Sequence, residues 1–376
     1  MKPLLPGSTI GILGSGQLGR MLALAAQRMG YRTHVYSPEK NSPAEHVCDA
    51  CTVASYTDAK ALAAFAASVD VVTFEFENVP FESAAQLAQE TLVRPRPEIL
   101  HTAQHRGREK TFLQQAGIPV VPFAWIRKAS EVEAAVKAVG LPGVLKTAGF
   151  GYDGKGQHKV ATLEDVARVV SASNQEWVLE RWQDFEKEAS VLVARGTEGN
   201  MVDWGAIENA HANHILDVSH APADVSARTA QELVATARTV AEKLDLVGLL
   251  CVEFFVAKDG SVCVNELAPR PHNSGHWTIE GSITSQFEQQ VRAVCGLSLG
   301  STEILAPSAM ANVLGDVWAN GEPDWQSALN AGPAKWHSYG KAEPRPGRKM
   351  GHFTAVAKTT AAAREAVIRA RSLLTN

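Results

Sequence analysis

The chain has 376 residues, of which 45% are hydrophobic and 20% charged, an ordinary balance for a globular protein of two or three domains. Its 36 basic and 40 acidic residues give a net charge of −4, which argues against nucleic acid or an anionic membrane as a partner. No apolar run reaches the ~18 residues of a membrane-spanning helix, and the N-terminus lacks the apolar core of a signal peptide. Five cysteines, an odd number, favour a reduced compartment, so we expect a cytoplasmic protein.

The first hundred residues alternate between strand and helix patterns. A strand over 8–13 precedes a helix over 17–29 and a strand over 31–36. A second helix over 58–68 leads into another strand over 70–74. This alternation predicts a parallel sheet covered by helices.

A GxGxxG motif, residues 14–19, lies between the first strand and the first helix, where dinucleotide-binding folds carry it. A nicotinamide enzyme would also place an acid at the end of the next strand, but Tyr36 and Ser37 stand there. The helix N-terminus still suits a phosphate or another anion; tight strand–helix packing is the alternative. Glu75 and Glu77 follow a strand at the edge where open sheets bind ligands, or are rim charges.

A second glycine cluster, residues 149–156, follows a short apolar strand at 143–145. It lacks the Ser or Thr of a P-loop, and a strand pattern follows it where a P-loop needs a helix. Closely spaced glycines let backbone amides approach an oxyanion, and Lys146 and Lys155 add positive charge. The pattern favours a flap over a triphosphate; a mobile linker is the alternative.

Helices are expected at 131–139 and 227–243, the second with a one-sided apolar stripe. After residue 301, short strands separated by turns precede a closing helix over 360–374.

Two apolar runs, 251–257 and 261–267, flank Asp259-Gly260, a strong hairpin signal. A two-residue loop would pair residue 256 with 263, and Glu253 with Glu266 on one face. Two facing carboxylates repel, whereas a Mg²⁺ ion between them reverses the sign. A solvated hairpin face with two unrelated acids is the alternative.

Several motifs together resemble one family. They are GILGSGQLGRM (11–21), FEFENVP (74–80), GYDGKGQ (151–157), NELAPRPHNSGHW (265–277), SQFEQ (285–289) and GRKMGH (347–352). With the flap and the carboxylate hairpin, they resemble the ATP-grasp superfamily and, within it, the N5-carboxyaminoimidazole ribonucleotide synthetases, over nearly the whole chain. GxGxxG is shared by many families, whereas the fourth and last motifs together are highly specific.

The resemblance implies a mixed α/β and α+β ATP-grasp architecture. A Rossmann-like domain would span 1–104, an ATP-grasp domain 105–300 with a flap lobe at roughly 120–185, and a small β-rich domain 301–376. It also implies a homodimer that converts 5-aminoimidazole ribonucleotide, bicarbonate and ATP into the N5-carboxylated ribotide, ADP and phosphate through carboxyphosphate, in purine biosynthesis.

The resemblance also implies the site residues. Glu253 and Glu266 would hold Mg²⁺, and Arg106, or alternatively Arg108, would contact ATP. The full ATP set is Arg106, Lys146, Gly151, Tyr152, Asp153, Gly154, Lys155, Gly156, Gln157, Glu180, Arg181, Trp182, Gln183, Glu188, His211, Asn265 and Glu266. The catalytic set is Asp153, Lys155, Arg270, His272 and Lys349. The ribotide set is Gly16, Gln17, Leu18, Glu75, Asn273, Ser274, Arg345 and Lys349.

Some alternatives stay open. The base that accepts the amine proton is either His272 or the departing phosphate. A formate-dependent ribotide transformylase or a biotin-carboxylase-like subunit would share the ATP-grasp features. A nicotinamide oxidoreductase explains only residues 11–19, and a nucleotide sensor would not need both a flap and a metal hairpin.

Overall fold

The computed structural model describes residues 2–149 and 156–375. Its N-terminal part is a parallel sheet in the order β3-β2-β1-β4-β5. The strands are β1 (Thr9–Leu13), β2 (Arg32–Ser37), β3 (Ala50–Val53), β4 (Val71–Phe74) and β5 (Leu92–Val93). The helices are α1 (Gln17–Arg28), α2 (Ala59–Ala66), α3 (Phe81–Glu90) and α4 (Pro97–Ala103). The predicted alternation is confirmed. α2 begins one residue later than expected because Asp58 caps its N-terminus, and it ends at Ala66, before the predicted end at residue 68.

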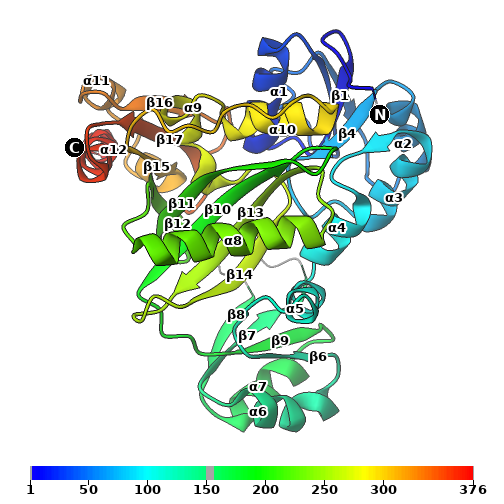
Figure 1. Ribbon diagram of the computed structural model, residues 1–376, viewed down its shortest axis with the longest axis vertical. Helices are drawn as coiled ribbons and strands as arrows, with labels where there is room; N and C mark the ends of the chain where they lie inside the picture. The colour runs from blue at the N-terminus through cyan, green and yellow to red at the C-terminus, as the bar shows by residue number, and fades with distance from the viewer. Residues whose placement is uncertain (1, 150–155, 376) are drawn as a thin grey trace.

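A four-stranded antiparallel sheet in the order β6-β9-β7-β8 forms a separate lobe at the lower end of Figure 1. Its strands are β6 (Phe123–Ile126), β7 (Gly143–Thr147), β8 (Gln157–Val160) and β9 (Trp177–Arg181). Its helices are α6 (Val132–Val139) and α7 (Leu163–Ser171), and α5 (Arg106–Gln115) lies at its upper boundary. The helix expected at 131–139 begins one residue late, because Glu131 closes a 3₁₀ turn.

The largest sheet has eight strands in the order β14-β13-β10-β11-β12-β15-β17-β16, all antiparallel. They are β10 (Lys187–Arg195), β11 (Met201–Ala212), β12 (Ile215–Ala221), β13 (Gly248–Val256), β14 (Val262–Ala268), β15 (Ser308–Leu314), β16 (Lys335–Ser338) and β17 (Lys349–Val356). The remaining α-helices of the described residues are α8 (Ala227–Lys243), α9 (Thr278–Gly281), α10 (Gln286–Cys295), α11 (Trp325–Leu329) and α12 (Thr360–Ser372). The strands after residue 301 therefore extend the same sheet that contains the hairpin.

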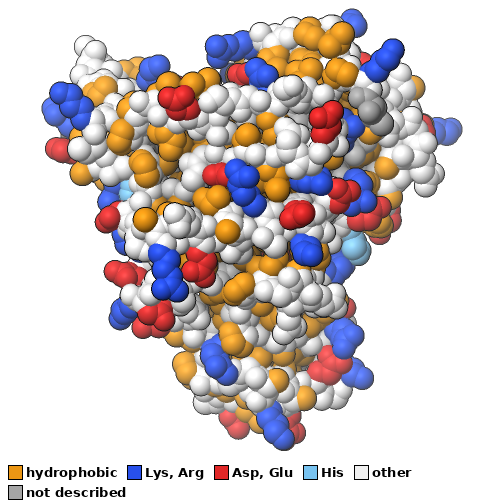
Figure 2. All heavy atoms as spheres, in the orientation of Figure 1, with side chains coloured by type: hydrophobic (Ala, Val, Ile, Leu, Met, Phe, Trp, Pro, Cys, Tyr) orange, Lys and Arg blue, Asp and Glu red, His pale blue; other side chains and the backbone are white. Residues whose placement is uncertain are grey.

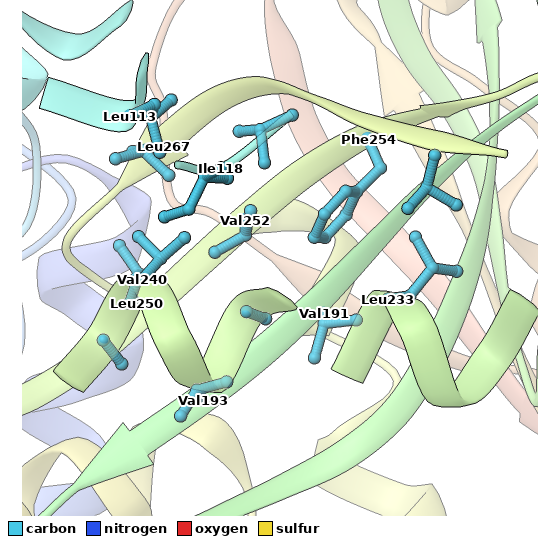
Figure 3. Close-up of a cluster of buried hydrophobic side chains, with 14 of the residues drawn as sticks. Leu113, Ile118, Val191, Val193, Leu233, Val240, Leu250, Val252, Phe254 and Leu267 are labelled. Carbon is cyan, nitrogen blue, oxygen red and sulfur yellow. The ribbon is translucent and has the colours of Figure 1, made fainter. Parts of the chain in front are cut away.

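A hydrophobic core lies between α8 and the hairpin half of this sheet (Figure 3). The predicted stripe on α8 supplies Leu233, Ala237, Val240, Ala241 and Leu244, which are all buried in this cluster. Fully burying one leucine or valine contributes about 1.5–3 kcal/mol. The cluster therefore fixes β13 and β14 against α8, which gives the polar side chains of the hairpin a rigid support.

The hairpin differs from its prediction in two places that compensate. Ala257 N–H donates to the Ser261 carbonyl, so the loop has three residues rather than two, and Val256 pairs with Val262. A bulge then leaves Asn265 unpaired and restores the expected pairing of Glu253 with Glu266. The predicted opposition of the two carboxylates is confirmed, whereas the predicted turn type and the pairing of residue 256 with 263 are wrong.

The surface carries no single-sign field on the face shown in Figure 2, where basic and acidic side chains are interspersed. Within the two described stretches, no helix combines the length and apolarity needed to cross a bilayer. All five cysteines are free thiols.

The hairpin loop generates a prediction. Gly260 is the last residue of the three-residue loop, and its N–H donates to the Ala257 carbonyl. Its φ of +81° lies in the left-handed region, as is usual for this position of such a loop. Gly260→Ala should cost about 1 kcal/mol, because a Cβ disfavours this conformation. Thermal unfolding should show a melting temperature lower by a few degrees. The exposed Lys258→Ala in the same loop is the control, and an equal effect of both changes would contradict the conformational explanation.

Candidate active site

Helix α5 joins the two lobes on either side of the site. It packs against β6 and β9 of the four-stranded sheet and against β14 of the large sheet. Its inward face carries Arg106, Glu109 and Lys110 at helical spacing, ahead of the core residue Leu113. Charged side chains from this face therefore reach both the hairpin and the smaller lobe.

The opposed carboxylates each have a cationic or hydrogen-bonding neighbour. His272 Nε2 lies 3.0 Å from Glu253 Oε1, and Arg106 Nη2 lies 3.5 Å from Glu266 Oε2. Burial alone would raise the pKa of Glu253, but His272 lowers it to about 2. Burial raises the pKa of Glu266, and the charge of Glu253 adds to this rise against the opposing effect of Arg106. The two facing carboxyl groups therefore differ in environment: the pKa of Glu253 is lowered, whereas that of Glu266 is raised.

Glu109 adds a third buried carboxyl group beside this pair. Its Oε2 accepts a hydrogen bond from the Leu267 N–H at 3.1 Å, and burial together with Glu266 raises its pKa to about 8. A neutral carboxylic acid at this place avoids a third negative charge beside the two facing carboxylates.

Glu180, at the end of β9, is shared by two lysines. Lys146 Nζ lies 2.9 Å from one carboxylate oxygen and Lys110 Nζ lies 3.3 Å from the other. Burial would raise the pKa of Glu180, but the two ammonium groups hold it at about 2. Lys110 also donates to the backbone carbonyl of Asn265, the bulge residue of β14. Lys146, which the second glycine cluster predicted, and Lys110, which it did not, therefore both lie next to the hairpin that carries the facing carboxylates.

Five of the predicted flap residues, Gly151, Tyr152, Asp153, Gly154 and Lys155, lie outside the described residues. Gly156 accepts a hydrogen bond from the Thr147 N–H, and Gln157 begins β8 opposite Lys146. A strand therefore follows the glycines, which agrees with the exclusion of a P-loop.

In the segment predicted to border the adenine, at the end of β9, the side chains point in different directions. Arg181 Nε donates to the Val139 carbonyl at 2.7 Å, so its side chain is directed to α6. Trp182 is 43% exposed, and the Lys159 ammonium lies 4.7 Å from its ring centre. Gln183 follows in the connection to β10. The side chains of Arg181 and Trp182 therefore contact other parts of the small lobe.

Glu188 and His211 meet on the neighbouring strands β10 and β11. His211 Nδ1 lies 2.8 Å from Glu188 Oε2. Burial lowers the pKa of His211, but the hydrogen bond with Glu188 outweighs this effect and raises it. The pair predicted for the ribose end is thus assembled in the structure.

The first glycine motif surrounds a buried carboxyl group, Glu75, whose pKa burial raises against the opposing effect of two backbone hydrogen bonds. Glu75 Oε1 accepts the Gly16 N–H at 2.8 Å, and Oε2 accepts the Gly19 N–H at 3.1 Å. A Cβ at Gly14 would lie 2.4 Å from Glu75 Cγ, so the glycine is required for this approach. Gln17 and Leu18 begin α1, and Leu18 packs in the core of the N-terminal part. Two of the amides that the motif predicts for an external anion, those of Gly16 and Gly19, are therefore taken by the protein's own carboxyl group.

Glu77, two residues further on, forms an ion pair with Arg270. Burial lowers the pKa of Arg270, but Glu77 reverses the direction and raises it. The pair connects the end of the N-terminal sheet to the segment after β14, so both predicted carboxylates after β4 are engaged.

His272 and Ser274 form one hydrogen-bonded unit behind Glu253. His272 Nδ1 lies 2.9 Å from Ser274 Oγ, and Ser274 Oγ lies 2.8 Å from Ser190 Oγ in the β10 strand. The amide oxygen and nitrogen of Asn273 are buried and have no hydrogen-bond partner among the described residues. An unsatisfied buried amide is costly, so a polar ligand at Asn273 would be stabilising.

The two basic residues near the C-terminus differ. Arg345 is exposed and pairs with Glu343. Lys349 begins β17 opposite Leu314, and its charge helps to lower the pKa of the fully buried His276, behind burial itself and two other histidines. Of the two, the structure brings Lys349 toward the segment after β14, whereas Arg345 lies on the surface.

Two residues of the site were missed by sequence reasoning. Glu109 and Lys110 lie one turn after Arg106, on the helix face that continues to the buried Leu113. Charged residues at i, i+3 and i+4 on the inward side of a helix were the available signal.

This combination of fold and buried charge defines an ATP-grasp protein. Residues 111–287 match the ATP-grasp domain, residues 7–104 the ribonucleotide synthetase preATP-grasp domain, and residues 308–366 the phosphoribosylaminoimidazole carboxylase C-terminal domain. The N5-carboxyaminoimidazole ribonucleotide synthase of Brucella melitensis is 45% identical over 362 residues, which cover 94% of this chain and 98% of that protein. The chain therefore belongs to the N5-carboxyaminoimidazole ribonucleotide synthase family, and it is an ATP-grasp ligase.

Two further relatives extend the comparison. The bifunctional purine synthesis protein purC/E of Dictyostelium discoideum is 42% identical over 93% of this chain, which spans 37% of that longer protein. A crystal structure of the Aspergillus clavatus synthase with ADP and 5-aminoimidazole ribonucleotide is 30% identical, covers 99% of both chains, and has a TM-score of 0.89.

The shared carboxylate predicts an acid dependence of stability. The pKa of Glu180 is lowered from 4.5 to about 2 in the folded protein. A lowered pKa stabilises the fold above the unfolded value, by about 3 kcal/mol near neutral pH, and this stabilisation is lost as pH falls from about 4.5 to 2. The melting-temperature difference between wild type and Glu180→Gln should therefore be largest above pH 5 and shrink below 4.5. A difference that grows on acidification would contradict the assignment.

Proposed function

We propose that this chain uses ATP and bicarbonate to carboxylate the exocyclic amine of 5-aminoimidazole ribonucleotide, with release of ADP and phosphate, in purine biosynthesis. The observation that carries the proposal is the facing pair Glu253–Glu266 with Arg106 and Lys146 beside it. The Brucella relative carries the name of this activity, and the Aspergillus structure contains ADP and the ribotide.

The two facing glutamates fit a magnesium ion. Mg²⁺ is usually held by one or two carboxylates together with nucleotide phosphates and water, so a cage of protein ligands is not required. Glu253 contacts His272 through Oε1, and Glu266 contacts Arg106 through Oε2. When bound, the ion would neutralise charge on the transferring phosphoryl group.

The nucleotide would lie between the two lobes. Lys146 and Arg106 would contact its phosphates, with Asn265 and Glu266 at the hairpin, and Glu180 to Gln183 would border the base. Glu188 and His211, whose side chains lie 2.8 Å apart, would bind the ribose hydroxyls. The predicted flap, Gly151 to Gln157, would complete the nucleotide site.

Phosphorylation makes bicarbonate reactive. A bicarbonate oxygen would attack the γ-phosphorus, ADP would leave, and carboxyphosphate would form. The protein's task is to align the reactants and to stabilise the developing charge. Arg270, Lys349, Lys155 and Asp153 are the proposed groups, and the pairing of Arg270 with Glu77 fixes the guanidinium in place.

The ribotide would bind toward the N-terminal sheet. Its amine would attack carboxyphosphate, or the CO₂ released from it, and lose one proton to His272 or to phosphate. Asn273, with its unsatisfied amide, and Ser274 would border the ribotide, together with Glu75, the turn at Gly16, Gln17 and Leu18, and Arg345 and Lys349. The homodimer, the cytoplasmic location and the domain limits at 104 and 300 belong to the same proposal.

A coupled ADP-release assay tests the reaction. ADP release should require bicarbonate and rise when the ribotide is added, because carboxyphosphate forms only from bicarbonate and is consumed by the amine. Formate in place of bicarbonate is the control for a transformylase. Formate-supported turnover, or ADP release that ignores both bicarbonate and ribotide, would contradict the proposed function.

The metal pair is tested by one isosteric change. Glu266→Gln removes one carboxylate charge while keeping side-chain size, so the rate of ADP release should fall by about 10²-fold or more through lost charge stabilisation. Circular dichroism and the melting temperature report whether the fold is retained. Glu186→Gln, outside the facing pair, is the matched control. Near-normal turnover of Glu266→Gln would remove this residue from the metal site.

A further inference from the structure

Lys110 is fully buried, which is rare for a lysine unless its charge is paired. Its Nζ lies 3.3 Å from Glu180 Oε1 and donates to the Asn265 carbonyl at 3.2 Å. Removing an ammonium group from water costs several kcal/mol. This cost suggests that Lys110 serves the neighbouring site and not only the packing of α5.

The two lysines around Glu180 are not equivalent. Lys146 lies on β7, near its C-terminal end, and its side chain is 11% exposed. Lys110 lies behind, on α5, with 1% exposure. Two ammonium groups share one carboxylate, so this group of three carries one net positive charge.

We propose that Lys110 is a positioning residue that leaves the charge of Lys146 available to the nucleotide phosphates. By holding one oxygen of Glu180, it prevents the carboxylate from neutralising Lys146 completely. Without Lys110, Glu180 and Lys146 would form a closed, neutral pair. The contact with Asn265 fixes the position of the ammonium group relative to β14. This inference rests on the proposed nucleotide site.

The experiment compares two ligands that differ in charge. Lys110→Met keeps the length of the side chain and removes its charge. Calorimetry with ADP and Mg²⁺ should show a Kd about tenfold higher than in wild type, since one positive charge near the phosphates is lost. The Kd of adenosine, which has no phosphate, should stay within about twofold. Equal losses for both ligands would show a merely structural role, and an unchanged ADP affinity would also overturn the inference.

A double variant tests the sharing of charge directly. Lys110→Met with Glu180→Gln removes one cation and one carboxylate, so the charge of Lys146 is again uncompensated. The ratio of the Kd of ADP to the Kd of adenosine should recover toward the wild-type ratio; the ratio is used because Glu180 also belongs to the segment proposed to border the base. A double variant whose ratio stays at that of Lys110→Met would contradict charge sharing. In the double variant, positions 110 and 180 are both uncharged and keep similar side-chain size. This variant can therefore be measured even if Lys110→Met alone does not fold.

A control variant and the wild type complete the design. Lys187→Met removes a lysine that is paired with Glu208 and Asp224, away from Glu180, and should leave ADP affinity unchanged. An effect of this change equal to that of Lys110→Met would overturn the specific role of Lys110. Wild-type protein that does not bind ADP would instead contradict the proposed function.

Discussion

The site depends on buried carboxylates that are compensated by groups from other parts of the chain. Glu180 of the smaller lobe is held by Lys110 of α5 and by Lys146 of β7. Glu266 of the hairpin is held by Arg106 of the same helix. Removing one member of such a group leaves an uncompensated buried charge, which costs more than the pair contributes to stability. The arrangement is therefore a strong constraint on how the two lobes meet.

The bulge in the hairpin determines which residue faces Glu253. The three-residue loop alone would bring a different residue opposite Glu253, and the extra residue Asn265 corrects the pairing to Glu266. The carbonyl of the same residue accepts the hydrogen bond of Lys110. The bulge, the facing carboxylates and Lys110 are thus connected through one residue, and α8 packs against the hairpin through the core in Figure 3.

The sequence predicted those features that depend on local pattern. The parallel sheet, helix α8 and the hairpin follow from periodicity and turn residues, and the facing of Glu253 and Glu266 was predicted from the hairpin register. The predicted loop was one residue too short, and the missed bulge compensated for it, because a bulge changes register without a strong local signal. Lys110 was missed because a charged residue on a polar helix predicts a solvated face until the neighbouring sheet is known.

In the GxGxxG motif, backbone amides that could bind an external phosphate bind a side chain of the protein instead. The motif predicts amides at a helix end that attract an anion, and in the structure the buried carboxyl group of Glu75 takes two of them. Glu77, two residues later, pairs with Arg270 beyond the hairpin. Alternate residues after β4 therefore perform two tasks: one carboxylate closes the helix end, and the next joins the N-terminal sheet to the segment that carries His272. A dinucleotide would have to displace Glu75 from both amides, and Tyr36 and Ser37 at the end of β2 supply no acid for its ribose.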